Sequence, residues 1–232
     1  MHKKSKVFIS IMMMMLLFGY CSICYAGDSD TKVQNYLMNT VTGKSTEIDL
    51  TTIPSPKVDL TTEQNIEEAS NVQPQGMYSE TFIRYDQNNS YYEWELKETG
   101  RARVDNRQSS QPATLQYSQT TGGSKDASFS GDATVSANVR NAIIAKINAT
   151  ASIQVAFTRN WSSSTSVIDT MRVPAGKVGT IICYVPGVSS NGQAVYIVSN
   201  TSDDTTFYRY KACGSIAPAK NSWNFKHIES SY

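Results

Sequence analysis

The chain has 232 residues, with 21 Lys and Arg against 20 Asp and Glu, and a formal net charge of +1. This length allows one domain with a substantial core, and the near-neutral charge argues against a dedicated nucleic-acid binder, which usually carries a basic excess. A hydrophobic content of 40% and a mean hydropathy of −0.36 exclude a protein built of many membrane-spanning helices.

The first 26 residues have the layout of a secretory signal peptide. Three lysines within the first six residues precede an apolar run over residues 7–18, and Cys24-Tyr25-Ala26 resembles a small-residue cleavage site. This run is shorter than the roughly 20 residues that a spanning helix needs. We therefore expect cleavage after Ala26 and a secreted, extracellular protein.

Cleavage after Ala26 would change the inventory of reactive side chains. It removes three lysines and no acidic residue, so residues 27–232 carry 18 basic and 20 acidic side chains. One histidine, His227, and two cysteines remain. In an exported chain Cys183 and Cys213 are most simply paired in a disulfide, and two buried free thiols are the alternative.

The motif content points away from enzymatic chemistry. No phosphate-binding loop, dinucleotide fingerprint or Gly-x-Ser-x-Gly elbow is present. His227, expected on the surface of a terminal strand, leaves no His and Cys set for zinc once the cysteines pair. We predict no catalytic residue, metal or cofactor. Glu93 and Glu95 are the best candidates for an acid-pair hydrolase, but the alternation around them is that of a half-buried strand with a solvated face.

Two regions follow the leader. Residues 27–76 are polar and lack a sustained period, which predicts a weakly ordered N-terminal arm or propeptide-like segment with short edge strands. Residues 77–232 form the predicted β domain, with short strands separated by turn signals at Asn88-Asn89, Thr99-Gly100 and Asn191-Gly192. The pattern predicts a mainly β fold, an elongated antiparallel sheet or sandwich.

The stretch from 127 to 168 is the most informative part of the β domain. Residues 127–137 alternate small or apolar side chains with polar ones, and a clear period of two resumes at Ala149. Between them, residues 138–147 fit either a short helix or a strand. Arg159 is the only charged residue between Ile147 and Ile168. The apolar face of the alternating segments comprises Phe129, Val135, Ala149, Ala151, Ile153, Val155 and Phe157.

An uncharged, Ser/Thr-rich segment with an alternating apolar face is typical of a membrane-inserting β-hairpin. Each spanning strand needs about 9–11 residues, and one hairpin cannot close a barrel, so several subunits would have to contribute. The alternative is an ordinary extracellular sheet whose outer face is rich in Ser and Thr.

Three motifs in this part of the chain resemble a known family. Ser128-Phe129-Ser130-Gly131, the alternation through Trp161-Ser162-Ser163-Ser164, and the exit Val173-Pro174-Ala175-Gly176-Lys177 are similar to the pattern in aerolysin-like β-pore-forming toxins, especially the epsilon-toxin/mosquitocidal-toxin group. The similarity covers about residues 127–185. It implies an aerolysin-like core in which this region carries the insertion hairpin and the Val-Pro turn leads into the next long strand.

Two functional interpretations stay open. The first is a secreted, non-enzymatic protein that acts on a target membrane as a homo-oligomer. The second is a secreted module that binds a glycan or protein receptor through exposed aromatic side chains and has no membrane activity. The aromatic residues expected in such a surface are Tyr91, Trp161, Tyr208 and Tyr210.

Overall fold

A computed structural model describes residues 31–50, 78–131, 136–163, 167–202 and 204–231, so the predicted signal peptide and Val135 lie outside the described residues. The described chain is mainly β, with antiparallel sheets and one helix, α2 (Ala137–Thr150). The predicted mainly β, antiparallel fold is thus confirmed. The segment 138–147, which fitted either a helix or a strand, is helical.

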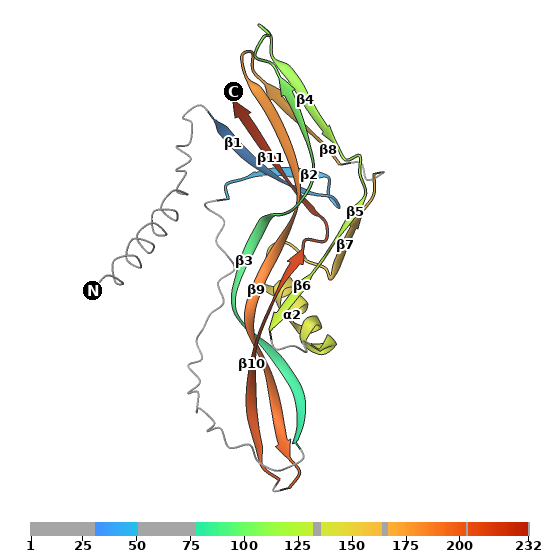
Figure 1. The fold of residues 1–232 in the computed structure, drawn as a ribbon, viewed down its shortest axis with the longest axis vertical. Helices are drawn as coiled ribbons and strands as arrows, with labels where there is room; N and C mark the ends of the chain where they lie inside the picture. Colours follow the sequence, from blue (N-terminus) through green and yellow to red (C-terminus); the bar gives the residue numbers. More distant parts are fainter. Residues whose placement is uncertain (1–30, 51–77, 132–135, 164–166, 203, 232) are drawn as a thin grey trace, which may run out of the picture. The chain divides into compact units, whose positions relative to one another are not determined.

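Strand β9 (Val178–Asn200) is the centre of the main sheet. On one edge, β3 (Tyr78–Asp105) pairs with it from Asn200 to Val178. On the other edge, β10 (Thr206–Pro218) pairs with the later part of β9 and β11 (Ser222–Ser230) with the earlier part. Strands β10 and β11 together therefore act as one long, interrupted third strand. Figure 1 shows β3, β9 and β10 running side by side.

Strand β3 runs for 28 residues where the sequence predicted three shorter strands. The predicted turns at Asn88-Asn89 and Thr99-Gly100 are instead irregularities in its pairing with β9. Asn191-Gly192 is no hairpin turn either, because it lies inside β9, where a Cβ on Gly192 would collide with the carbonyl oxygen of Asp86. These turn-prone residues let long strands shift register and approach closely, and they do not reverse the chain.

Strands β1 (Lys32–Asn39) and β2 (Lys44–Ile48) extend the main sheet beyond β11. β1 pairs with β11 along its whole length, and β2 pairs with β1. Residues 32–48 thus form two ordered strands, whereas the sequence predicted a weakly ordered arm with short edge strands over 27–76. At this edge of the sheet no side chain of β1 or β2 is fully buried, so their apolar period is weak. Residues 51–76 lie outside the described part of the chain.

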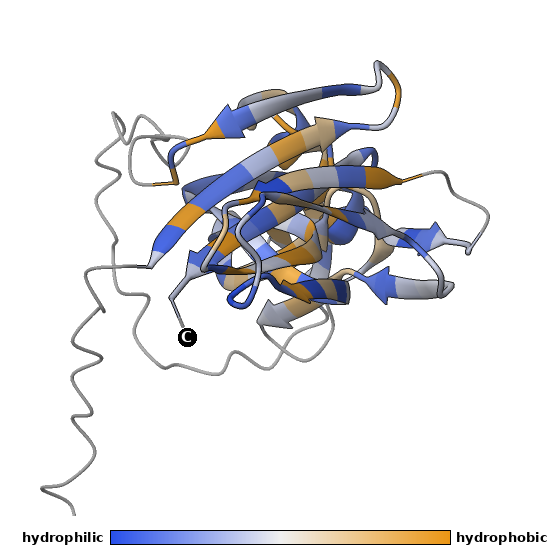
Figure 2. Cartoon of the chain, turned by 90° about the horizontal axis from the view of Figure 1, so that it is seen from above, coloured by the Kyte–Doolittle hydropathy of each residue, from blue (hydrophilic) through white to orange (hydrophobic). Residues whose placement is uncertain are grey.

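Five short strands complete the fold. β4 (Ala113–Ser118) pairs with β8 (Ile168–Val173), and β5 (Gly123–Asp126) pairs with β7 (Thr158–Trp161). β6 (Ser128–Gly131) joins the main sheet beside β10. Seen from above, hydrophobic and hydrophilic residues alternate along several strands, as expected for strands with one buried face (Figure 2).

Two hydrophobic cores hold these parts together. In the first, helix α2 packs against β3, β9 and β10. In the second, β4 and β8 pack against β9 and β11. The largest fully buried side chains of the first core are Val139, Ile143, Ile147 and Val188, and those of the second are Trp223, Phe225, Ile181, Val167, Val173 and Val185.

Candidate functional site

The strongest functional candidate is the paired hairpin over residues 113–173. Its arms pair first in β4–β8 and then in β5–β7, where Asp126 lies opposite Thr158. One step further along the same register, the amide of Ala127 donates to the carbonyl of Phe157 at 2.7 Å. The arms then separate, because β6 pairs with β10 and the chain goes on to form α2.

The predicted apolar face does not form one strand. Ala149 is exposed on the last turn of α2, and Ala151 is the half-buried residue at its C-cap. Ile153 and Val155 are buried, and Val155 forms an isolated bridge to Ala219. The strand predicted to resume at Ala149 is therefore wrong. The remaining described members, Phe129 and Phe157, have ring centroids 5.9 Å apart at the point where the arms separate.

Side-chain contacts explain why a helix replaces that strand. Ile143 and Ile147 are fully buried on one face of α2. The Asn148 side chain donates to the carbonyl of Val155 at 3.2 Å and accepts from its amide at 2.7 Å, which fixes the chain after the helix. Burial still alternates, since Ser152 and Gln154 are exposed and the residues between and after them are buried. The period of two predicted the burial of Ile153 and Val155 correctly, but Ala149 and Phe157 are exposed and the backbone is not a continuous strand.

Helix α2 has weak intrinsic support. Its N-cap, Ser136, accepts a long hydrogen bond of 3.4 Å from the amide of Val139. The first turn contains no acidic residue and the last turn no basic residue, so the helix dipole is not complemented. Eight of its 14 residues are Asn, Val, Ile or Thr, all with lower helix propensity than Ala or Leu. Packing on the sheet must therefore supply most of its stability.

That packing is partly polar. Four buried polar residues, which we call the polar bed, lie on neighbouring strands on the same sheet face as the first core. They are Gln87, Ser90, Ser190 and Ser215. Gln87 donates to Ser190 Oγ at 2.9 Å and accepts from Thr150 of α2 at 3.2 Å. The hydroxyls of Ser90 and Ser215 have no hydrogen-bond partner within the described residues. Because a buried unsatisfied hydroxyl costs roughly 1–3 kcal/mol, the interface beneath α2 is less stable than an apolar one would be.

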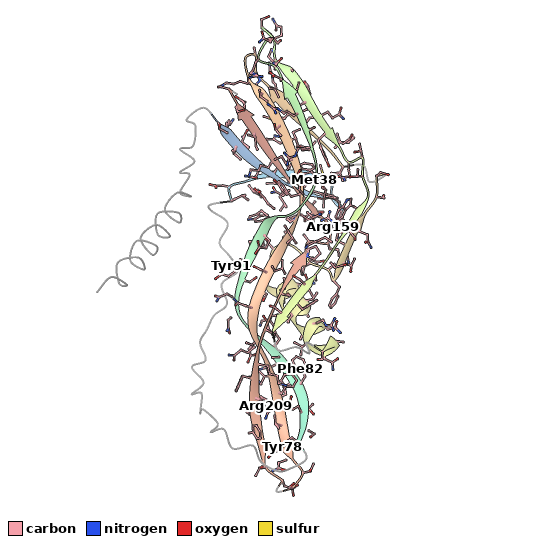
Figure 3. The ribbon with its side chains drawn as sticks, viewed as in Figure 1. Met38, Tyr78, Phe82, Tyr91, Arg159 and Arg209 are labelled. Carbon is pink, nitrogen blue, oxygen red and sulfur yellow. The ribbon has the colours of Figure 1, made fainter. Side chains whose placement is uncertain are left out.

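Arg159 anchors the second arm of the hairpin to the main sheet. Its buried guanidinium donates to the carbonyl of Ala219 at 2.8 Å and to the carbonyl of Ser222, and it lies 4.1 Å from the Trp223 ring centroid. Ala219 lies between β10 and β11, and Ser222 and Trp223 begin β11. Figure 3 labels Arg159. Burial lowers the pKa of Arg159 to about 10, which leaves the side chain charged at neutral pH. Sequence reasoning missed this role, although a lone charge in an uncharged stretch was a usable signal.

A second anchor joins β8 to β11. His227 Nε2 and the Asp169 carboxylate form a hydrogen bond in a mostly buried setting. The His227 ring lies 4.6 Å from the Tyr36 ring, beside a cavity of about 490 Å³. Burial, and then the carboxylates of Glu47 and Asp169, raise the pKa of Tyr36. The predicted surface position of His227 is wrong, because β8 and β1 cover that part of β11.

The predicted disulfide is wrong, because Cys183 and Cys213 are both free and buried. Cys213 pairs in register with Gly192 of β9, nine residues beyond Cys183 in the same strand. At about 3.3 Å per residue the two cysteines are about 30 Å apart along the sheet, far more than a disulfide can bridge. They belong to different cores, and burial raises the pKa of each thiol, that of Cys183 to about 11.

The four aromatic residues predicted to form one binding surface lie in three places. Tyr91 is 50% exposed and lies on β3 opposite Ser189 (Figure 3). Tyr208 and Tyr210 are exposed on β10, and Tyr208 lies opposite Ile197, about 26 Å further along β9. Trp161 is half-buried and packs edge-to-face on Trp223, with ring centroids 5.9 Å apart. Tyr91 borders a hollow in the sheet surface.

Glu93 and Glu95, the candidates for an acid pair, both lie on strand β3. Glu95 forms an ion pair with Lys226 at 2.8 Å, and the neighbouring rings of Tyr92 and Trp94 stack with centroids 4.8 Å apart. No group of three or more His, Cys, Asp or Glu residues is placed to hold a metal ion within the described part of the chain. In the same residues, no helix combines the length and apolar character that crossing a membrane would require.

Fold and site together define an antiparallel β protein whose central hairpin carries a helix and is held to the main sheet by two polar anchors. The chain matches the YfkD-like protein family over residues 61–200, more than half of its length, and belongs to that family. The matched range includes the whole hairpin. A comparison with curated proteins gave no match.

Proposed function

We propose that this protein acts on a target membrane through a change in which α2 unfolds and the hairpin lengthens through residues 127–157. The main observation that supports this proposal is the register in which β5 pairs with β7. Continued beyond the bond between Ala127 and Phe157, that register would bring apolar residues into opposition on one face. The resulting pairs would be Phe129 with Val155, Gly131 with Ile153, Ala133 with Ala151, Val135 with Ala149 and Ala137 with Ile147.

The other face of the lengthened hairpin would be polar, apart from Ala156. In this register residues 127–138 would pair with residues 146–157, so each arm holds 12 residues. Each is long enough to cross a bilayer, which takes about 9–11 residues of tilted strand. The apolar face would contact lipid and the polar face a water-filled lumen. Because one hairpin leaves two unpaired edges in lipid, several copies of the chain would assemble into a closed barrel.

Three further observations support the proposal. The helix has weak propensity, its interface contains unsatisfied hydroxyls, and the arms that lead into it are already paired. The sequence motifs resemble those of aerolysin-like toxins, and the long antiparallel strands β3, β9 and β10 are in keeping with an aerolysin-like core. We therefore include an aerolysin-like core in the proposal. The predicted leader would bring the protein out of the cell and to a membrane.

Release of dye from vesicles of phosphatidylcholine, with and without an anionic lipid, tests the proposal. The variant Ser128→Cys/Ile216→Cys ties β6 to β10, because these exposed residues lie opposite each other in the sheet. We expect release by the wild type, no release by the oxidised variant, and recovery of release after reduction.

The matched control is Ser124→Cys/Asn160→Cys, an exposed pair within β5–β7. A disulfide at this position joins arms that stay paired in both states, so oxidation should leave dye release unchanged. Intact vesicles over a wide range of wild-type concentrations, without an SDS-resistant oligomer, would refute the proposal. Equal release by the oxidised Ser128/Ile216 variant and its reduced form would refute the role given to β6.

A further inference from the structure

The sheet face opposite α2 contains a hollow of about 630 Å³ midway along β3, β9, β10 and β6. Ser190 and Phe129 also border the hollow, but they alternate along their strands with its exposed residues and, like Ser90, lie on the side of the first core. The lining forms two cross-strand rows. One row contains Tyr91, Ser189, Ile216 and Ser128, and the next contains Asn89, Asn191, Gly214 and Ser130.

Among the residues that the structure describes, no charged side chain lines this hollow. Its polar groups are amides and hydroxyls, which both donate and accept hydrogen bonds. Its large exposed apolar side chains are Tyr91, 50% exposed, and Ile216, 37% exposed. In one adjoining row β3 presents the carboxylate of Glu93, which disfavours an anionic ligand, and in the other Asp86 forms an ion pair with Arg84.

We infer that this hollow binds a neutral oligosaccharide. A sugar presents hydroxyls that match amide and Ser side chains, and C–H faces that pack on an exposed aromatic ring. A phosphate or acidic glycan would need cationic partners, and the lining provides none. A lipid chain or apolar peptide would leave the exposed amides of Asn89 and Asn191 without partners. The inference does not depend on membrane insertion.

Titration of the protein with neutral tetrasaccharides of hexose and of N-acetylhexosamine, followed by calorimetry or NMR, tests the inference without lipid. We expect saturable binding of one class, weakened about tenfold or more by Tyr91→Ala and by Asn191→Ala. Tyr208→Ala is the matched control, because Tyr208 is equally aromatic, exposed and on the same sheet face. Its affinity should equal that of the wild type.

Thermal unfolding should be unchanged in the variants, since Tyr91 and Asn191 are exposed. Asn191→Asp, which keeps the size of the side chain and adds a negative charge, offers a second variant should Asn191→Ala lose stability. It should bind the same sugar more weakly. The inference is overturned if no neutral sugar binds saturably, if binding survives both Tyr91→Ala and Asn191→Ala, or if acidic glycans bind more tightly than neutral ones.

Discussion

The main sheet and the hairpin over 113–173 differ in the length of their strand pairing and in the burial of their side chains. In β3, β9, β10 and β11 the ladders run for many residues and enclose fully buried aliphatic and aromatic side chains. In the hairpin the ladders are short and interrupted, and the segment between the arms is a helix of low propensity on the polar bed. Cooperative stability is thus concentrated in the sheet, and local opening should begin in the hairpin.

The largest expected effect comes from placing a charge on the proposed lipid face. Ala149 is exposed on α2, so Ala149→Lys should leave the soluble fold stable. In the lengthened hairpin the same lysine would face lipid, where a cationic side chain costs about 2–4 kcal/mol at the bilayer midplane. We expect dye release to be lost while the Tm is unchanged.

Ala145→Lys is the control for this substitution. Ala145 is also exposed and lies four residues earlier on the same helix, but it would fall in the turn of the hairpin. Dye release should continue with this variant. Equal activity of Ala149→Lys and Ala145→Lys would contradict the assignment of the lipid face.

Removing the Arg159 side chain should cause the largest loss of stability. Arg159→Ala leaves the carbonyls of Ala219 and Ser222 without this donor and opens space beside Trp223. We expect a loss of about 3–5 kcal/mol in the free energy of unfolding, measured with urea, and faster dye release. Arg172→Ala, at an exposed site on β8, should change stability by less than about 0.5 kcal/mol. Similar losses in both variants would show that Arg159 is no anchor.

Raising the pH above 9 should lower the free energy of unfolding, because the thiol of Cys183 in the main sheet is buried. Burial raises the pKa of this thiol from 9.0 to about 11, so between these values the unfolded chain ionises and the folded chain does not. The stabilising contribution is therefore complete below pH 9 and decreases by about 1.4 kcal/mol by pH 10. Urea unfolding at pH 8 and pH 10 should show a smaller decrease for Cys183→Ala than for the wild type. The same decrease in both would place the titrating groups elsewhere.

The smallest expected effect is a gain in stability at the polar bed. Ser215→Ala removes a buried hydroxyl that has no hydrogen-bond partner among the described residues. We expect stabilisation by about 0.5–1 kcal/mol and slower dye release, because the helix would then rest on a less polar surface. Ser130→Ala, on exposed β6, should change neither quantity. Destabilisation by Ser215→Ala would mean that this hydroxyl is satisfied.

The sequence predicted the fold class and the burial of Ile153 and Val155, because a period of two reports burial directly, although Phe157 on the same predicted face is exposed. It could not predict the 28-residue strand β3, because the residues that allow bulges are also those that make turns. The sequence pattern could not predict the register between strands either. This register separates Cys183 from Cys213 and brings Asp169 to His227, contacts that no local pattern encodes.

The most direct test of the proposed conversion uses Asn138→Cys/Lys146→Cys. Both positions are exposed on α2, where eight residues of helix separate their backbones by about 12 Å, too far for a disulfide. In the continued register of β5–β7 they would lie opposite each other, with Cα atoms about 5 Å apart. We predict an intramolecular disulfide on dye-releasing vesicles and none in solution. Dye release without that disulfide would contradict the conversion of α2 into a hairpin.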